Sequence, residues 1–206
     1  RISIIGLGHV GLTLFLGLSI FNYKNIYGID TNVKTLNGLK KNIIPFYEQG
    51  LNSLLEECNK KSNINLINNF KNLQSDVYIL CVGTPCDSKN VPNLKYVKSA
   101  IKSLRKNLKK GDLIILRSTM PVGTTREEII PLLSDNNDLI LGKDFFIVFA
   151  PERLVEGNAL EELRTLPQIL GGYSAKCTHV ATSFFRSANI RTIIVNSLEE
   201  AELIKL

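Results

Sequence analysis

The sequence predicts an α/β fold in which a doubly wound, mostly parallel sheet carries helices on both faces. Short apolar runs alternate with helix-compatible segments along the 206 residues. The run at 76–82 is apolar at four of its positions, Val77, Ile79, Leu80 and Val82, as expected of a strand buried on both faces. Several runs stop at glycine, proline or hydroxyl residues, which is typical of strand ends that face a ligand site in such sheets.

The expected elements follow in chain order. Strands are predicted at 2–5, 25–29, 64–67, 76–82, 113–116, 145–149 and 191–195, with a further apolar run at 169–172. Helices are predicted at 12–21, 31–41, 52–60, 94–108, 126–133 and 175–186, and Ser197 is a suitable N-cap for a last helix. We expect one domain over 1–196, and we expect 197–206 to begin a helix that leads to a central or C-terminal region of a longer protein.

The first strand ends in the loop Gly6-Leu7-Gly8-His9-Val10-Gly11, and the second strand ends at Asp30. Gly6 allows a tight turn, Gly8 lets the backbone approach a pyrophosphate, and Gly11 lets the helix pack close to the strand. The free N–H groups of the helix start hold the phosphate charge, while the carboxylate of Asp30 accepts hydrogen bonds from both ribose hydroxyls. This pattern predicts a Rossmann-type domain, and the acid favours NAD over NADP.

Composition narrows the classes of function. The net charge of +6 comes from scattered lysines without interleaved aromatic residues, so we expect no nucleic-acid partner, whereas phosphorylated ligands suit the charge. No apolar run approaches the roughly 18 residues of a membrane helix, and we expect a cytoplasmic protein with no membrane partner. The four cysteines form no CxxC pair and the two histidines lie far apart, so the sequence predicts free thiols and no metal site.

Polar breaks follow three successive strands, at 83–85, 118–119 and 151–152. In a parallel sheet all three lie on the same edge as the glycine loop. Taken singly, Thr84 is more often a cap than a ligand contact, whereas Ser118 and Thr119 are equally compatible with capping the helix that follows Gly123 and with ligand contacts. Because Glu152 shares this edge with the predicted cofactor, it is the leading acid/base candidate.

Six motifs, in order, carry a more specific signal. They are the glycine loop at 6–11, Ile44-Pro45-Phe46-Tyr47-Glu48-Gln49-Gly50-Leu51, Cys81-Val82-Gly83-Thr84-Pro85, Arg117-Ser118-Thr119-Met120-Pro121-Val122-Gly123-Thr124, Pro151-Glu152-Arg153-Leu154-Val155-Glu156-Gly157 and Ala201-Glu202-Leu203-Ile204-Lys205-Leu206. Together they resemble the N-terminal NAD-binding domain of the nucleotide-sugar 6-dehydrogenases, the family of UDP-glucose, UDP-N-acetylmannosamine and GDP-mannose dehydrogenases. The resemblance spans essentially the whole chain.

The resemblance implies an enzyme of polysaccharide biosynthesis that oxidises the C6 alcohol of a nucleotide sugar to a carboxylate in two NAD-dependent steps, through a thioester on a cysteine. It implies that Glu152 handles water as acid/base, that Lys205 holds an oxyanion, and that Thr119 positions water and cofactor. Further cofactor contacts implied are Leu7, His9, Val10, Thr84, Pro85, Ser118 and Glu156, and the implied substrate contacts are Glu152, Arg153, Leu154 and Lys205.

The chain also departs from the family pattern. The family's nucleophilic cysteine lies beyond Leu206, and none of Cys58, Cys81, Cys86 and Cys177 stands in a matching motif. His9 stands where the family often has an aromatic residue. The family usually contacts the adenosine ribose with a basic residue shortly after the acid, and in this chain Lys34 is the substitute for it. The stretch 151–153 resembles branches that act on 2-acetamido sugars more than the UDP-glucose branch. We expect a UDP-sugar substrate and a homodimer or larger assembly.

Two other readings of the sequence stay open. A 3-hydroxyacid or 6-phosphogluconate type dehydrogenase shares the glycine loop, but it gives no reason for the motifs at 45–51 and 151–157. A non-catalytic module that senses NAD would need only the glycine loop and Asp30.

Overall fold

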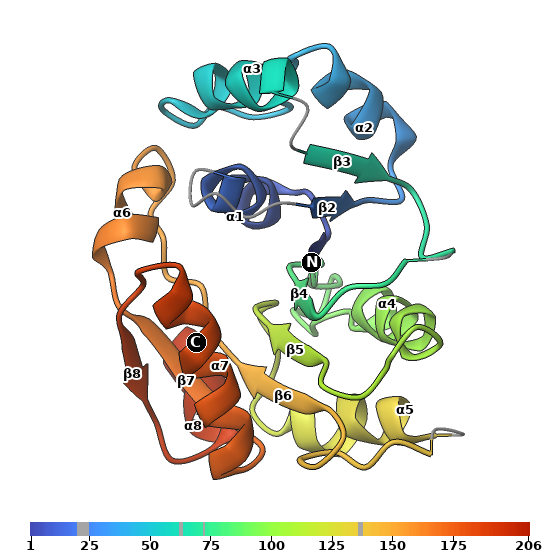
Figure 1. Ribbon diagram of the computed structural model, residues 1–206. Coiled ribbons are helices and arrows are strands. Elements are labelled where there is room, and N and C mark those ends of the chain that lie inside the picture. The colour runs from blue at the N-terminus through green and yellow to red at the C-terminus, as the bar shows by residue number, and fades with distance from the viewer. Residues whose placement is uncertain (20–24, 62–63, 72, 136–137) are drawn as a thin grey trace.

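The computed structural model describes residues 1–19, 25–61, 64–71, 73–135 and 138–206. A twisted sheet of eight strands, in the order β3-β2-β1-β4-β5-β6-β7-β8, forms its central layer (Figure 1). The strands are β1 (Ile2–Ile5), β2 (Ile26–Ile29), β3 (Ile64–Ile67), β4 (Val77–Leu80), β5 (Leu113–Leu116), β6 (Phe146–Phe149), β7 (Gln168–Gly172) and β8 (Thr192–Ile194). The first six pair in parallel, which confirms the predicted fold class.

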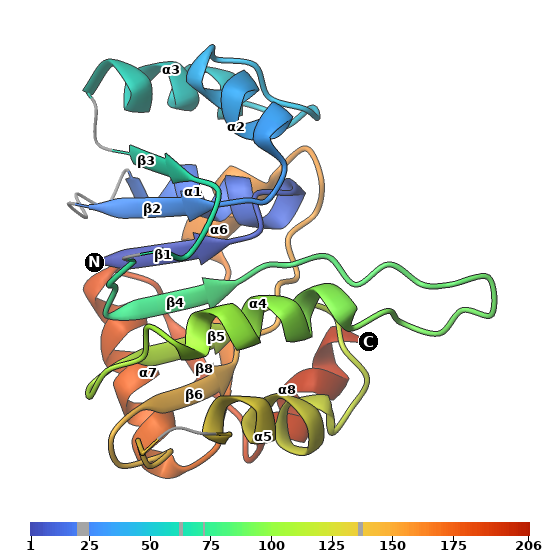
Figure 2. The same cartoon turned by 90° about the vertical axis from the view of Figure 1, so that its right-hand side faces the viewer.

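Helices cover both faces of the sheet. One face packs against α1 (His9–Ser19), α2 (Val33–Lys40), α3 (Leu51–Lys61), α6 (Ala159–Thr165) and α7 (Ala175–Ser187). The other face packs against α4 (Lys95–Arg105), α5 (Ile130–Ser134) and α8 (Leu198–Lys205). Neighbouring strand residues serve opposite faces, since Ile4 belongs to the first buried cluster and Ile5 to the second. Figure 2 shows the parallel strands, such as β1, β2 and β4, running toward one edge, where the loops that carry the predicted site gather.

The structure corrects three expectations. Strand β7 runs antiparallel to β6, and β8 runs in the same direction as β7. The last two strands of the mostly parallel sheet therefore run opposite to the first six. The predicted helix at 126–133 is a π-helical turn, η1 (Thr125–Ile129), followed by α5. Pro131 lacks the N–H that a regular helix needs at that position, and Ile130 instead donates to the carbonyl of Thr125. Helix α6 was not predicted, because its seven residues are too few to show a periodic pattern.

Element boundaries otherwise lie close to the predictions. Helix α1 begins at His9, earlier than predicted, and positions 20–21 of the predicted 12–21 helix lie outside the described residues. Ser197 caps α8 as expected, with its hydroxyl accepting from the N–H of Glu200. All four cysteines lie in the described ranges and are unpaired. In the described part of the chain, no helix combines the length and the apolar character that a bilayer crossing requires.

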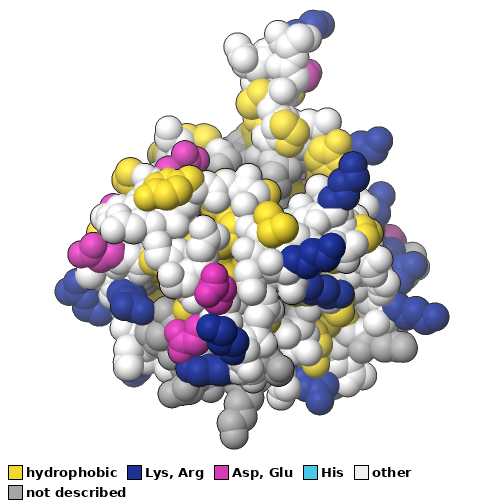
Figure 3. Space-filling model, turned by 90° about the horizontal axis from the view of Figure 1, so that it is seen from above, with side chains coloured by type: hydrophobic (Ala, Val, Ile, Leu, Met, Phe, Trp, Pro, Cys, Tyr) yellow, Lys and Arg dark blue, Asp and Glu magenta, His cyan; other side chains and the backbone are white. Residues whose placement is uncertain are grey.

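An arm at 84–93 joins β4 to α4 and projects from the body of the molecule (Figures 2 and 3). A bridge between Cys86 and Pro92 pairs its two sides, and the N–H groups of Lys89 and Val91 donate to the Asp87 carboxylate at the tip. Figure 3 also shows Lys and Arg side chains spread over this face among acidic and neutral ones.

Candidate active site

A cleft of about 990 Å³ opens at the carboxyl ends of β1, β2 and β4. The glycine loop forms its floor, while α4 and the segment after β3 form its walls. Residues of the sequence motifs that line it are Gly6, Gly8, His9, Val10, Asp30, Cys81, Val82, Gly83 and Pro85. The predicted edge of the sheet therefore holds a cavity large enough for a dinucleotide.

The three glycines of the loop are required for different reasons. Gly6 has a φ of +89°, and a Cβ there would lie 2.9 Å from the carbonyl oxygen of Cys81. A Cβ on Gly11 would lie 1.8 Å from the carbonyl oxygen of Gly6, so the close packing of α1 on β1 excludes any side chain. Among the described residues, no atom lies within 4 Å of the Cβ position of Gly8, which faces the cleft. The free space at Gly8 fits the pyrophosphate of a dinucleotide.

Asp30 directly follows β2, and its carboxylate is already oriented. One oxygen accepts from the N–H of Leu7 at 2.8 Å and the other from the N–H of Asn32 at 2.8 Å. A carboxylate has about four acceptor positions, so both oxygens can still accept a ribose hydroxyl. Lys34, the predicted substitute for a basic ribose contact, is exposed on α2 and is not among the described residues that line the cleft.

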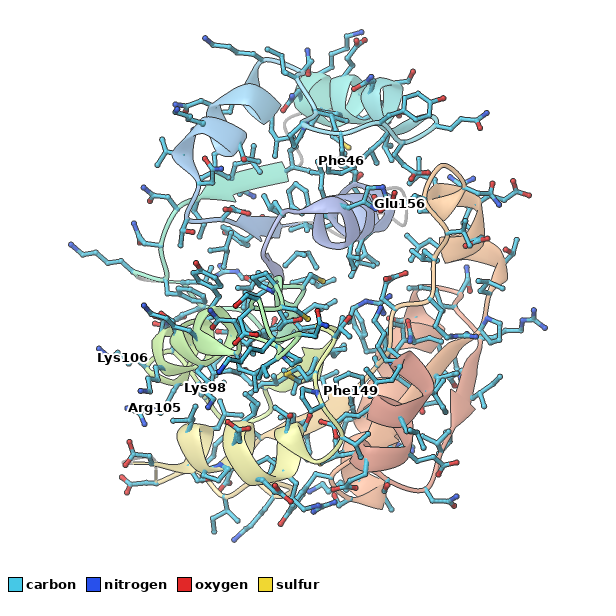
Figure 4. All side chains as sticks on the ribbon, turned by 180° about the vertical axis from the view of Figure 1, so that it is seen from behind. Phe46, Lys98, Arg105, Lys106, Phe149 and Glu156 are labelled. Atoms are coloured by element: carbon cyan, nitrogen blue, oxygen red, sulfur yellow. The ribbon has the colours of Figure 1, made fainter. Side chains whose placement is uncertain are left out.

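Two lysines that the sequence did not single out do line the cleft. Lys71 follows β3 and Lys106 follows α4. Figure 4 shows Lys106, just beyond the end of α4, near Arg105 and Lys98 of that helix. Neither belongs to a motif, so only the packing of α4 and of the β3 segment around the cleft identifies them.

The predicted nicotinamide half lies where β4 and β5 end. The hydroxyl of Thr84 donates to the carbonyl of Thr119 at 2.6 Å and ties the two strand ends together. Ser118 is 6% exposed, and its hydroxyl has no hydrogen-bond partner among the described residues. Thr119 and Glu156 are exposed at this edge. A buried hydroxyl without a partner is rare, which suits a group that receives one from a ligand.

Glu152, in the loop after β6, forms an ion pair with Lys205, the last residue of α8. Glu152 is 7% exposed, and the Lys205 ammonium lies 3.0 Å from its carboxylate. The same ammonium also donates to the Glu152 carbonyl, and the N–H of Leu154 donates to the carboxylate. Arg153 donates to the carbonyl of Pro167 at 2.8 Å. The structure thus brings together the two residues predicted for catalysis, although they are 53 positions apart.

Cys81 borders both the cleft and this ion pair. Burial raises the pKa of its thiol to about 12, although Arg117 and Lys205 act in the opposite direction. Only the thiolate is a strong nucleophile, so Cys81 is unsuited to form a thioester near neutral pH. Arg117 is itself buried, and burial lowers the pKa of its guanidinium. It donates to Gln168, whose amide in turn donates to the carbonyl of Pro151 at 2.9 Å.

Two buried carboxylates hold the loops of the site, and neither was predicted as functional. Glu202 is 0% exposed and accepts from the N–H groups of Gly123 at 2.6 Å and Thr125 at 2.8 Å, at the end of the 117–124 loop. Glu48 is 4% exposed and accepts from those of Gly157 at 2.8 Å and Ala159 at 2.9 Å. Both lie inside the recognised motifs, but their partners are far away in sequence.

The fold and the cleft together define a nucleotide-binding domain of the doubly wound class, with an acid and a lysine paired beside the cofactor cleft. The model of the UDP-glucose/GDP-mannose dehydrogenase family, NAD binding domain, matches residues 1–189. The chain therefore belongs to this family and is its NAD-binding domain, as the six motifs predicted. NAD is its cofactor, and the open space at Gly8 and the oriented carboxylate of Asp30 fit it.

Similar proteins include curated relatives and solved structures. The UDP-N-acetyl-D-mannosamine dehydrogenases of Pyrococcus horikoshii and Methanocaldococcus jannaschii are 30% and 31% identical over all of this chain, which covers 49% and 47% of them. The structure of the Pyrococcus enzyme superposes with a TM-score of 0.91 over 100% of this chain and 49% of its own. A ternary complex of GDP-mannose dehydrogenase from Pseudomonas aeruginosa gives 0.90 at 27% identity, over 100% of this chain and 48% of its own. The chain spans about half the length of the curated relatives it matches.

Proposed function

We propose that this chain is the cofactor-binding part of a cytoplasmic nucleotide-sugar dehydrogenase that oxidises the sugar C6 alcohol to a carboxylate in two steps. The observation that carries the proposal is the pairing of Glu152 with Lys205 beside the NAD cleft. The similar proteins from Pyrococcus and Methanocaldococcus are named for UDP-N-acetyl-D-mannosamine, which supports a UDP-linked 2-acetamido sugar.

The two paired residues supply complementary chemistry. NAD, when bound, would supply the hydride acceptor for each oxidation. The ammonium of Lys205 stabilises negative charge that develops on the sugar oxygen, because a fixed cation in a shielded site acts without solvent reorganisation. The carboxylate of Glu152 takes a proton from the water that hydrolyses the covalent stage. Each is the counterion of the other in this structure, so both groups are held at the same place beside the cleft.

The surrounding loop gives the substrate its remaining contacts. Arg153 and Leu154 follow Glu152 directly, and we assign them to the sugar nucleotide. Arg153 is exposed and uses one N–H for the Pro167 carbonyl, and the planar fork of donors on a guanidinium is well suited to a diphosphate. Ser118 and Thr119, together with Thr84, Pro85 and Glu156, are assigned to the nicotinamide half of the cofactor.

NAD binding and sugar oxidation by the chain and by the whole protein test this assignment. The 206-residue chain should bind NAD yet form no NADH with UDP-N-acetylmannosamine, UDP-glucose or GDP-mannose, because it lacks a suitable cysteine and half of the cleft. The whole protein should turn over a UDP-sugar, and Glu152→Gln should lower its kcat by roughly 100- to 10,000-fold while NAD still binds. Steady turnover by the chain alone would mean that one of its own cysteines reacts. Absence of turnover by the whole protein would favour an NAD sensor.

A further inference from the structure

Glu48 occupies a position for which the catalytic assignment gives no reason. It lies on the loop between α2 and α3, and its side chain is 0% exposed. Its carboxylate accepts from the N–H groups of Gly157 at 2.8 Å and Ala159 at 2.9 Å. A buried charge needs such partners, and the two N–H groups at the start of α6 supply them.

These two N–H groups end the loop that carries Glu152. The loop leaves β6 at Ala150 and enters α6 at Ala159. Its last residues depend on the Glu48 carboxylate and on Glu162, whose carboxylate accepts from the N–H of Val155 at 2.7 Å. Glu48 therefore fixes one end of the segment that positions the acid/base candidate.

The other side of Glu48 reaches the cofactor cleft. His9 begins α1 and lines the cleft beside Gly8 and Val10. Its ring packs on Phe46 at 4.5 Å between centroids, and its Nε2 lies 3.3 Å from the Glu48 carboxylate. Nε2 is buried and lies within ion-pair distance of the carboxylate, but it forms no hydrogen bond with any described residue. In Figure 4, Phe46 and Glu156 mark the loops that meet beside α1.

We propose that Glu48 is a positioning residue that couples NAD binding, through His9, to the loop carrying Glu152. Phosphate bound at residues 8–10 orders the start of α1 and draws the His9 ring into a hydrogen bond with Glu48. The carboxylate then holds the N–H groups of Gly157 and Ala159 more firmly. Because such coupling is reciprocal, an ordered 150–157 loop also strengthens NAD binding. The role of Glu152 rests on the proposed function, but the coupling itself does not.

Amide hydrogen exchange on the 206-residue chain, resolved by NMR with and without NAD, tests the coupling. In the unaltered chain, NAD should slow exchange at Gly157 and Ala159 by about fivefold or more, the lower end of typical couplings. The amide of Ile115, in the buried centre of the sheet, corrects for any general stabilisation. Calorimetry establishes that NAD saturates each variant.

Two variants separate coupling from a structural role. His9→Phe keeps a ring against Phe46 but removes the nitrogen, so exchange without NAD should stay unchanged while the slowing by NAD is lost. Glu48→Gln should speed exchange without NAD, because an amide accepts poorly from two N–H groups, and should also lose the response. Glu202→Gln is the matched control in the 117–124 loop. It should speed amide exchange at Gly123 and leave the slowing of exchange by NAD at Gly157 intact.

Two results would overturn the coupling. One is an unaltered chain in which NAD leaves Gly157 and Ala159 unchanged relative to Ile115. The other is a His9→Phe chain that keeps the full response to NAD. Neither result depends on sugar turnover, so each is distinct from a failure of the dehydrogenase assignment.

Discussion

The two halves of the sheet edge satisfy their polar groups in different ways. In the cofactor half, at the ends of β1, β2 and β4, Gly8 faces open space and the Asp30 carboxylate keeps free acceptor positions. In the catalytic half, at the ends of β5 and β6, Glu152 is paired with Lys205 and Arg117 with Gln168. The cofactor half therefore keeps open space and free acceptor positions, whereas the charged groups of the half predicted to be catalytic are already paired with one another.

Burial explains the difference. Glu152 and Arg117 are 7% and 4% exposed, and a charge so far from water needs partners whether or not substrate is bound. Asp30 is only half-buried, so water serves its free acceptor positions until a ribose replaces it. Loss of one partner in the catalytic half leaves a charge uncompensated, but the same loss in the cofactor half mainly reduces affinity.

The largest effect should come from Gly8→Val. The side chain would enter the space of the pyrophosphate, and loss of two charge-assisted hydrogen bonds weakens binding by at least about 100-fold. Because no described atom is near the Cβ position, the thermal midpoint should stay close to that of the unaltered chain. Calorimetry with NAD and a thermal melt measure both quantities.

Gly11→Val is the matched control for this substitution. Its side chain would meet the Gly6 carbonyl, so here the fold should fail rather than the affinity. A Gly8→Val chain that folds and binds NAD normally would mean that the whole loop serves the fold alone.

A middle-sized effect is expected at Asp30. Asp30→Ala should lower the affinity for NAD by roughly 10- to 100-fold, which corresponds to the loss of one charged hydrogen bond. It should also narrow the preference for NAD over NADP. The preference itself arises because the carboxylate would repel the 2′-phosphate of NADP. Titration of both cofactors by calorimetry gives the ratio directly.

Asp30→Asn separates charge from geometry. The amide oxygen can keep one of the backbone N–H contacts, so this chain should melt close to the unaltered one while the preference still narrows. Equal or tighter binding of NADP by the unaltered chain would show that the acid does not select the cofactor.

The smallest effect should come from a surface pair in the catalytic half. Arg126 hydrogen-bonds Glu199 and holds the pKa of that carboxyl at about 2, below its usual 4.5. A lowered pKa stabilises the fold above pH 4.5, and this contribution is lost as the pH falls toward 2. Both side chains are partly exposed, so the pair contributes about 0.2–1 kcal/mol.

Arg126→Ala should therefore lower the melting temperature at pH 7 by up to about 4 °C. The difference from the unaltered chain should disappear near pH 2, and NAD affinity should not change. A difference of the same size at both pH values would assign the loss to the contact of Arg126 with the Tyr173 ring, at 5.7 Å.

The sequence alone determined those features of the molecule that depend only on residues close together in the chain. Gly6 and Asp30 act within one strand-turn-helix unit, so their spacing alone predicted their places. The carboxyl ends of parallel strands share one edge, which also brought the breaks at 83–85, 118–119 and 151–152 together in the prediction. Motif order also predicted roles for Glu152 and Lys205 in one site, and the structure places the two side chains in contact.

Only the tertiary structure decided how the loops are held. Glu48 binds an N–H 109 positions away and Glu202 one 79 positions away, and no periodic pattern encodes such pairs. The antiparallel direction of β7 was also invisible, because a strand buried on both faces has the same apolar composition in either direction. Turns and ligand loops depend on the residue types of a few neighbouring positions, so they can be predicted from sequence. The partner of a buried charge depends on which elements the folded chain brings together.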